Sequence, residues 1–200
     1  MRGLGRKVLA LTVAIGLLAF FMVACNTGPS YQIDEANKYI NKANEHIENN
    51  NKLDGEIKEM GDKMTAQLKT PEDFAAAVPQ LEEIKKKLGE QKVEMEKAVE
   101  QYDSALKLNL SPDHKTYIGL LKDSANKQIE ANAYNLQSIQ ALSVLVTSIG
   151  NGTATDATIS EQQKTIDDLT AESDKLKQAA TDLKAQADKL YKDKNLGSAS

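Results

Sequence analysis

The sequence predicts an all-α protein folded as an elongated, antiparallel, up-down-up-down four-helix bundle. The composition favours helices, because only 4% of the residues are aromatic, 27% are charged and Trp is absent. Apolar residues recur at heptad-like spacing through four long segments, and breaks containing Pro or Gly separate those segments. We expect helices over residues 31–69, 71–110, 112–149 and 158–193, which form one bundle domain (31–193) followed by a flexible C-terminal tail (194–200).

The first segment, 31–69, contains a pattern that could divide it. The run Asn49, Asn50 and Asn51, followed by Asp54 and Gly55, is a strong turn signal. The apolar stripe nevertheless keeps its register on both sides of this run, so the sequence favours one continuous helix. Two rows form that stripe: Ala36, Ala43, Ile57 and Met64, and beside them Ile33, Ile40 and Ile47.

The second and third segments begin with the same chemistry. Thr70 before Pro71 and Ser111 before Pro112 are each typical of a helix N-cap followed by Pro in the first turn. Pro79 predicts a kink, or a separate turn over residues 74–78. In the second segment's stripe only Gln91 is polar. The third segment ends at residues 150–152, where the glycines favour left-handed caps, and residues 153–158 form the expected flexible loop.

The fourth segment has the most regular pattern. One row contains Ile159, Ile166, Ala180 and Ala187, and the other contains four leucines, so we expect the tightest packing around Leu176. Ser173 alone interrupts the first row. Short connections make consecutive helices antiparallel neighbours. An open pair of hairpins that dimerises is the alternative arrangement. The leucines are Leu169, Leu176, Leu183 and Leu190.

Residues 1–24 predict an export signal peptide. Arg2, Arg6 and Lys7 precede an uncharged apolar run from residue 8 to residue 24. As a helix this run would span about 26 Å, which is shorter than a hydrocarbon core of about 30 Å. The length therefore fits a signal better than a permanent membrane span.

The apolar run ends at the chain's single cysteine, in the order Met22, Val23, Ala24, Cys25. This segment resembles the lipobox of prokaryotic lipoproteins, with Met22 in place of the usual Leu. The resemblance covers residues 1–25 and implies a diacylglycerol thioether on Cys25, cleavage between Ala24 and Cys25, and a short tether over residues 25–30. An ordinary cleaved signal and an uncleaved anchor helix are the alternatives, and both still export the domain.

The charge of the exported part disfavours nucleic acid as a partner. Without Arg2, Arg6 and Lys7, the 25 basic residues fall to 22, all of them Lys, against 29 acidic residues, so the formal charge changes from −4 to −7. Phosphate contacts dominate nucleic-acid affinity, and this net field repels them. The exported part also lacks Arg for a bidentate clamp on phosphate or carboxylate.

No motif in the sequence predicts a catalytic, cofactor-binding or metal site, so we expect a protein that is not an enzyme. In the expected register His46 and His114 lie too far apart to share a metal, and each fits a surface or helix-end position better. Three methionines fit core positions better than a copper site. Asn151 and Asn109 begin N-glycosylation sequons, a pattern that often arises by chance. The methionines are Met60, Met64 and Met95.

Two functions remain from the sequence. The first is a membrane-anchored structural or protein-interaction lipoprotein, held through Cys25 on the extracytoplasmic face of the cell membrane, or of an outer membrane where the organism has one. Its expected partners are an envelope protein and, in a homo-oligomer, further copies of the chain. The second is an extracytoplasmic ligand-binding or sensory bundle with a pocket between helices near Tyr102, Tyr117 and Tyr134.

Overall fold

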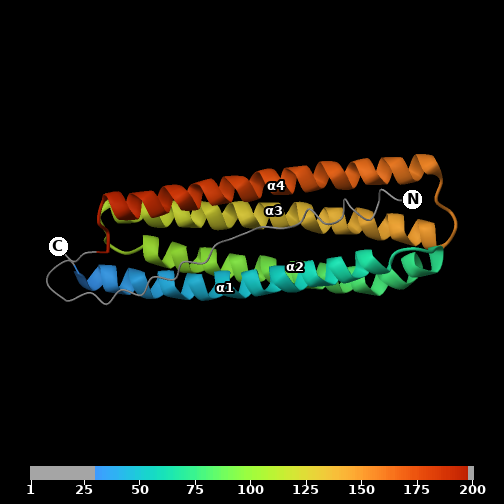
Figure 1. Cartoon of the computed structure of the whole chain (residues 1–200). Helices are drawn as coiled ribbons and strands as arrows, with labels where there is room; N and C mark the ends of the chain where they lie inside the picture. Colours follow the sequence, from blue (N-terminus) through green and yellow to red (C-terminus); the bar gives the residue numbers. More distant parts are fainter. Residues whose placement is uncertain (1–29, 198–200) are drawn as a thin grey trace.

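The computed structural model describes residues 30–197 and contains four long helices, so the predicted all-α four-helix bundle is confirmed. These are α1 (Ser30–Gln67), α2 (Pro71–Leu106), α3 (Pro112–Gly150) and α4 (Asp156–Asp193). They run up, down, up and down along one long axis (Figure 1). With 36 to 39 residues each, they are about 55 Å long. The signal-peptide and lipidation predictions at residues 1–25 lie outside the described residues.

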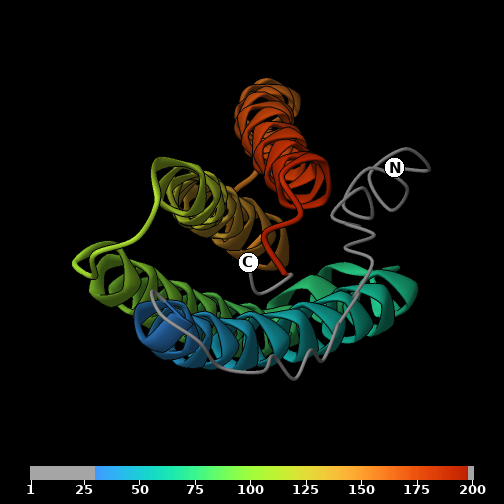
Figure 2. The ribbon, with the colours of Figure 1, turned by 90° about the vertical axis from the view of Figure 1, so that its left-hand side faces the viewer.

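Each helix packs on the helices that precede and follow it in the chain. Extensive interfaces join α1 to α2, α2 to α3 and α3 to α4, and among the described residues α1 and α4 share no comparable interface. Viewed along the axis, α1 and α2 lie side by side, α3 packs over them, and α4 lies beyond α3 (Figure 2). The interface between α2 and α3 joins the two hairpins into one bundle that is open between α1 and α4.

Helix α1 is continuous through residues 49–55, as the stripe register predicts. The turn signal at these residues does not break the helix, because Asn50 and Gly55 both occupy positions that a helix accommodates. Asn50 is only 7% exposed and faces the bundle interior. Gly55 lies on the exposed face, where an added Cβ would meet no atom within 4 Å.

Side-chain caps fix three helix starts. Thr70 and Asp73 form a reciprocal capping box at α2, and the Ser111 hydroxyl accepts from the His114 backbone N–H at α3. At α4 the capping box pairs Thr155 with Thr158. The loop predicted over residues 153–158 is therefore too long, because α4 begins at Asp156, where the cap satisfies its first donors.

Helix α2 differs from its prediction in two ways. It continues through Pro79 without a separate turn, because the helix is long enough to be held by packing on both of its neighbours. It ends at Leu106 rather than at residue 110, and the Leu108 N–H then bonds to the Ala105 carbonyl in a tightened turn. Leu110 is part of the connection to α3 and is 8% exposed, so this loop is anchored in the core.

Gly150 is needed for a close approach between helices, whereas Gly152 has the left-handed conformation, with φ of 69°. A Cβ on Gly150 would lie 2.9 Å from the Ala75 backbone nitrogen. At the other end of the bundle the tail predicted to be flexible from residue 194 begins as a capping turn, in which the Leu196 N–H bonds to the Tyr191 carbonyl at 3.0 Å. Residues 198–200 lie outside the described residues.

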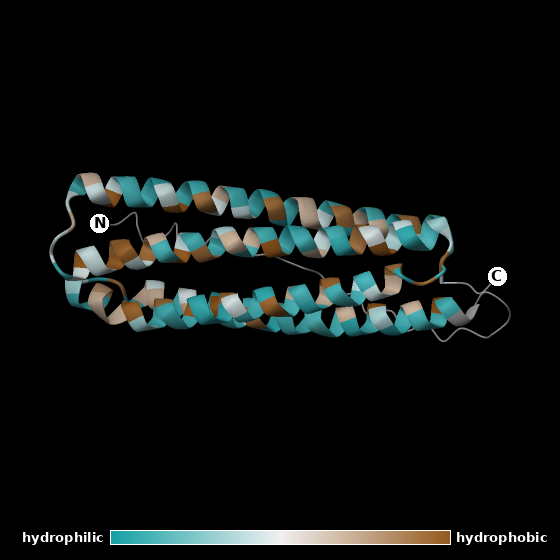
Figure 3. Ribbon diagram, turned by 180° about the vertical axis from the view of Figure 1, so that it is seen from behind, coloured by the Kyte–Doolittle hydropathy of each residue, from teal (hydrophilic) through white to brown (hydrophobic). Residues whose placement is uncertain are grey.

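The apolar core is divided into three clusters along the bundle. One lies around Tyr102 where α1 begins, the second lies around Leu145 at the opposite end, and a small third cluster contains Ile57 and Leu88. Hydrophobic and hydrophilic residues alternate along every helix (Figure 3). The interval between the end clusters is where the candidate site lies.

The prediction that the tightest packing of α4 lies at Leu176 is wrong. All four leucines of that row are only partly buried, whereas Ile166, Ser173, Ala180 and Ala187 are buried. The reason is the open arrangement: α4 packs extensively on α3 alone, so one narrow row of mostly small residues enters the interface. The leucines lie beside it, toward solvent.

Within the described residues, no helix combines the length and the apolar character that crossing a membrane requires.

Candidate functional site: a polar cleft at the middle of the bundle

Polar side chains are buried near the middle of all four helices. In an antiparallel array of equal helices the midpoints lie side by side, so residues that are 40 or so apart in sequence meet at one level. Apolar residues alone would have made this level the centre of the core. Instead the middle section of the bundle contains Asn50 from α1, Gln91 from α2, Ser124, Asn132, Asn135 and Ser138 from α3, and Ser173 from α4, each no more than 7% exposed.

Some of these groups bond to the backbone of a neighbouring helix. Gln91 Nε2 donates to the Asn50 carbonyl at 3.2 Å, and Asn132 Nδ2 donates to the Leu88 carbonyl at 3.0 Å. Ser124 Oγ donates to the Ala180 carbonyl at 2.7 Å. These bonds link α1 to α2, α2 to α3 and α3 to α4. Buried polar groups that are satisfied in this way also fix the register of the helices.

The same level contains a cleft of about 230 Å³. Its walls are α1 and α4, the two helices that do not pack on each other, and its floor is formed by α3 with Gln91 of α2. Amide, hydroxyl and charged side chains supply much of the lining, together with three alanines. The residues that matter most below are Asp54, Asn132, Asn135 and Lys177.

Three buried polar atoms of the cleft have no hydrogen-bond partner within the described protein. They are Oδ1 of Asn132, Oδ1 of Asn135 and Nζ of Lys177. A buried polar group without a partner costs about 1–3 kcal/mol, so three such groups on residues that line one cleft are an unfavourable arrangement. Two acceptors and one cationic donor on residues of the cleft are therefore left without a partner in the described protein.

Asp54 on α1 and Lys177 on α4 place opposite charges on the two walls. Burial raises the pKa of the Asp54 carboxyl, and the Lys177 ammonium and the Gln91 amide oppose that rise. Burial lowers the pKa of the Lys177 ammonium, and Asp174 and Asp54 oppose that fall. In both residues the desolvation exceeds the attraction between the charges.

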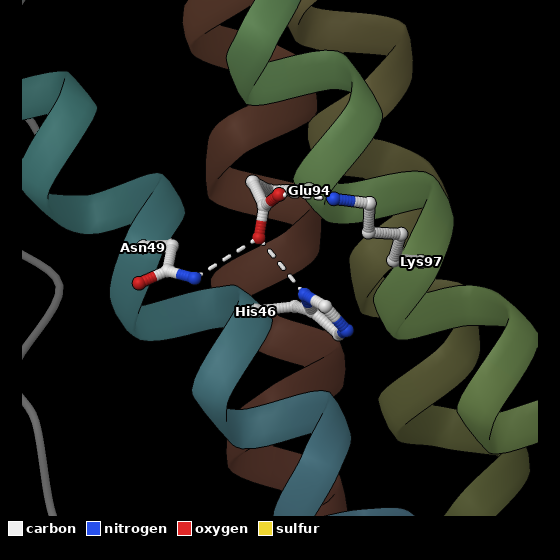
Figure 4. A network of polar contacts seen from close by, with 4 residues as sticks. All are labelled: His46, Asn49, Glu94 and Lys97. Carbon is white, nitrogen blue, oxygen red and sulfur yellow. Dashed lines mark hydrogen bonds and ion pairs between the residues drawn. The ribbon is translucent and has the colours of Figure 1, made fainter.

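A second polar network lies on the α1–α2 seam (Figure 4). Glu94 accepts from Lys97 Nζ at 2.6 Å, lies 2.8 Å from His46 Nδ1 and accepts from Asn49 Nδ2 at 3.1 Å. The hydrogen bonds from Lys97 and His46, the two largest causes, lower the pKa of the Glu94 carboxyl to about 2. This network is saturated by protein groups, so it joins two helices and offers no free ligand.

The structure places the other residues singled out by the sequence away from the cleft. His114 lies in the first turn of α3, where Nδ1 is 2.7 Å from the Ser111 hydroxyl. Met64 and Met95 are buried in different end clusters, and Met60 packs against the third, as the core interpretation predicts. Asn151 is the exposed residue after α3. Among the described residues, no three or more His, Cys, Asp or Glu side chains are grouped so as to hold a metal ion.

The cleft is not lined by the three tyrosines near which the sequence predicts a pocket. Tyr102 is 1% exposed inside the apolar end cluster, and the Tyr117 ring packs 5.2 Å from that of Tyr191. Neither these residues nor Tyr134 lines the cleft. Aromatic rings bury large apolar surfaces, so Tyr102 and Tyr117 pack in the apolar end cluster, whereas amide side chains line the cleft.

Part of the signal for the cleft was already visible in the sequence. Gln91 and Ser173 each interrupt an otherwise apolar row, and both prove to be buried at the cleft level. Asn50 and Asp54 fell within the predicted turn signal, although both lie in the middle of a continuous helix. Asn132, Asn135 and Lys177 were missed, because polar residues in a helix are ordinarily assigned to its solvent face.

In comparisons with known proteins, no family model, no curated protein and no solved structure matches this chain.

Proposed function

We propose that this chain is a membrane-anchored, extracytoplasmic lipoprotein whose helical bundle is a non-enzymatic structural or protein-interaction module of the cell envelope. The anchor is the lipobox-like sequence that ends at Cys25. Because α1 begins at Ser30, the bundle would stand close to the membrane, with the Tyr102 cluster at its near end. Two acyl chains would be enough for stable anchoring, whereas one chain binds only marginally.

The observation that carries the interaction role is the half-buried leucine row of α4. Leu169, Leu176 and Leu183 are partly buried beside the row of α4 that packs on α3. None of them lines the cleft between α1 and α4, and none belongs to the three apolar clusters of the described residues. Leucines at regular helical spacing that are only partly covered are typical of a face that receives another helix. Such a face supports a partner protein in the envelope or a second copy of the chain.

The anchor is tested with Cys25→Ala. We expect the unchanged protein to sediment with membranes and to carry a diacyl-modified residue 25 by mass spectrometry. The variant should be released or mislocalised, and an inhibitor of lipoprotein signal peptidase should block processing of the unchanged protein. An unmodified residue 25 in membrane-derived protein would disprove lipid anchoring.

The partner role is tested by crosslinking in cells from single cysteines placed along the leucine row in the Cys25 background, at Leu176 for example. A cysteine at the exposed Glu172 is the matched control. We expect a discrete crosslinked species from Leu176 and none from Glu172. Equal, diffuse labelling from both positions would contradict a specific partner on this face.

A second function, an extracytoplasmic ligand-binding or sensory bundle, is favoured by a separate observation. The cleft contains unpartnered buried polar atoms from α3 and α4. Protein interiors are close-packed and satisfy their polar groups, so a polar cavity between helices is a typical binding site. In this case the anchor would hold the bundle at the membrane while the cleft binds a small molecule from outside. The two functions are compatible in one protein.

A further inference from the structure

The cleft limits the ligand by size. Its volume of about 230 Å³ equals about eight water molecules at their share of liquid volume. Drug-sized ligands and cofactors need about 300 to 1,000 Å³. The cleft cannot enclose a nucleotide, a lipid chain or an oligosaccharide, whereas a molecule of the size of an amino acid fits within it.

The free hydrogen-bonding groups limit its chemistry. Lys177 Nζ is a cationic donor without a partner, so it requires an acceptor, and an anionic acceptor makes the strongest such bond. Asn132 Oδ1 and Asn135 Oδ1 are acceptors without partners, on side chains that are 6% and 5% exposed, so they require N–H or O–H donors. The ligand must therefore present both an anion and hydrogen-bond donors.

The charges of the walls agree with that requirement. Asp54 on α1 and Lys177 on α4 both line the cleft, and no ion pair within the described residues joins them. A purely anionic ligand would meet the Asp54 carboxylate, and a purely cationic ligand would meet the Lys177 ammonium. A zwitterion satisfies both walls, because its opposite charges match theirs.

We propose that the cleft binds a small zwitterion of the α-amino-acid class. Its carboxylate pairs with Lys177 of α4, and its ammonium group donates to the amide oxygens of Asn132 and Asn135 and faces Asp54. This inference rests on the second proposed function and specifies its ligand. The variable side chain would point to the open edge between α1 and α4, where the cleft reaches Thr181 and Lys184.

The test is a titration of the full chain, purified in detergent, with L-serine and each of the other common L-amino acids. The side-chain amide signals of Asn132 and Asn135 are followed by nuclear magnetic resonance after isotopic labelling. Propionate provides the carboxylate alone, and ethanolamine provides the ammonium and hydroxyl without the carboxylate. We expect at least one amino acid to shift both signals, and both fragments to bind about tenfold or more weakly, as the loss of one charge-assisted bond requires.

Substitutions locate the site. Lys177→Met should weaken binding about tenfold or more, whereas Lys175→Met, at an exposed residue of the same helix that pairs with Glu172, should leave it unchanged. Well-dispersed spectra from both variants would exclude unfolding as the cause. Equal affinity in the two variants would overturn the assignment of Lys177.

The failures are distinguishable. If no amino acid shifts either amide signal at about 10 mM, a concentration that detects even millimolar affinity, the inference is wrong and the cleft is a hydrated polar layer. If glucose shifts them instead, the ligand-binding function stands and the zwitterion is wrong. Neither result bears on anchoring, which depends on Cys25 and is measured by fractionation.

Discussion

His46 Nδ1 on α1 lies 2.8 Å from Glu94 Oε2 on α2, and this contact crosses the seam of the first hairpin. The same carboxylate oxygen accepts from Asn49, and the other accepts from Lys97. Glu94 therefore contacts donors from two helices while its side chain is only 16% exposed. A group held in this way should contribute to stability in a manner that depends on pH.

Glu94→Gln should destabilise the bundle at pH 7 by about 1–2 kcal/mol, through loss of charge-assisted hydrogen bonds. The folded protein lowers the Glu94 pKa from 4.5 to about 2, so the carboxylate stabilises the fold above pH 4.5 and this contribution is lost as the pH falls toward 2. The difference in free energy of unfolding between variant and parent should shrink over that range in denaturant titrations. Glu96→Gln, at an exposed residue of the same helix, is the control, and a difference that does not change with pH would contradict the assigned network.

Lys177→Met should make the bundle more stable at pH 7 by about 1 kcal/mol, because it removes a buried ammonium that has no hydrogen-bond partner. For a chain of this size that corresponds to a rise in melting temperature of about 2–4 °C. Burial lowers the Lys177 pKa, so the unfolded chain holds the proton more tightly and the penalty decreases as the pH rises toward 10.5. Thermal melts at pH 7 and at pH values up to 10.5 would measure both effects. A less stable variant would show that Lys177 is satisfied in the folded protein.

Gly150→Ala should destabilise the bundle by about 1–3 kcal/mol, because the new methyl group would lie 2.9 Å from the Ala75 backbone nitrogen and force α2 and α3 apart. Gly119→Ala is the matched control in the same helix, since a Cβ there meets nothing within 4 Å. It should be neutral or stabilising by up to about 1 kcal/mol. Urea denaturation compares the two variants, and equal stabilities would show that the close approach of the helices is relaxed in solution.

Ala187→Asp should cost several kcal/mol, about 3 or more, because residue 187 is 0% exposed in the interface between α3 and α4 and a carboxylate there would be unpaired. Leu176→Asp should cost less, about 1 kcal/mol, since Leu176 is only partly buried and its carboxylate could reach water. Guanidinium titrations would rank the two. The reverse order would place the seam of α4 on its leucine row.

Helix number, two of the helix starts and the topology followed from local chemistry, because capping residues act within one turn and short connections make neighbours antiparallel. Thr70, Pro71, Ser111 and Pro112 gave two of these starts correctly, and the stripe register predicted that α1 is continuous through Asn50. The end of the second helix, predicted at residue 110, and the start of the fourth, predicted at residue 158, were displaced. A helix boundary depends on which cap forms rather than on periodicity.

The sequence by itself determined that the chain forms four amphipathic helices, because helical periodicity is a property of each segment alone. Only the tertiary structure decided which of two apolar rows in α4 is covered, since that depends on whether α1 or only α3 packs against it. It also decided that Asn132, Asn135 and Lys177 share one cleft, because a polar residue becomes part of a site only when distant helices place other polar residues beside it.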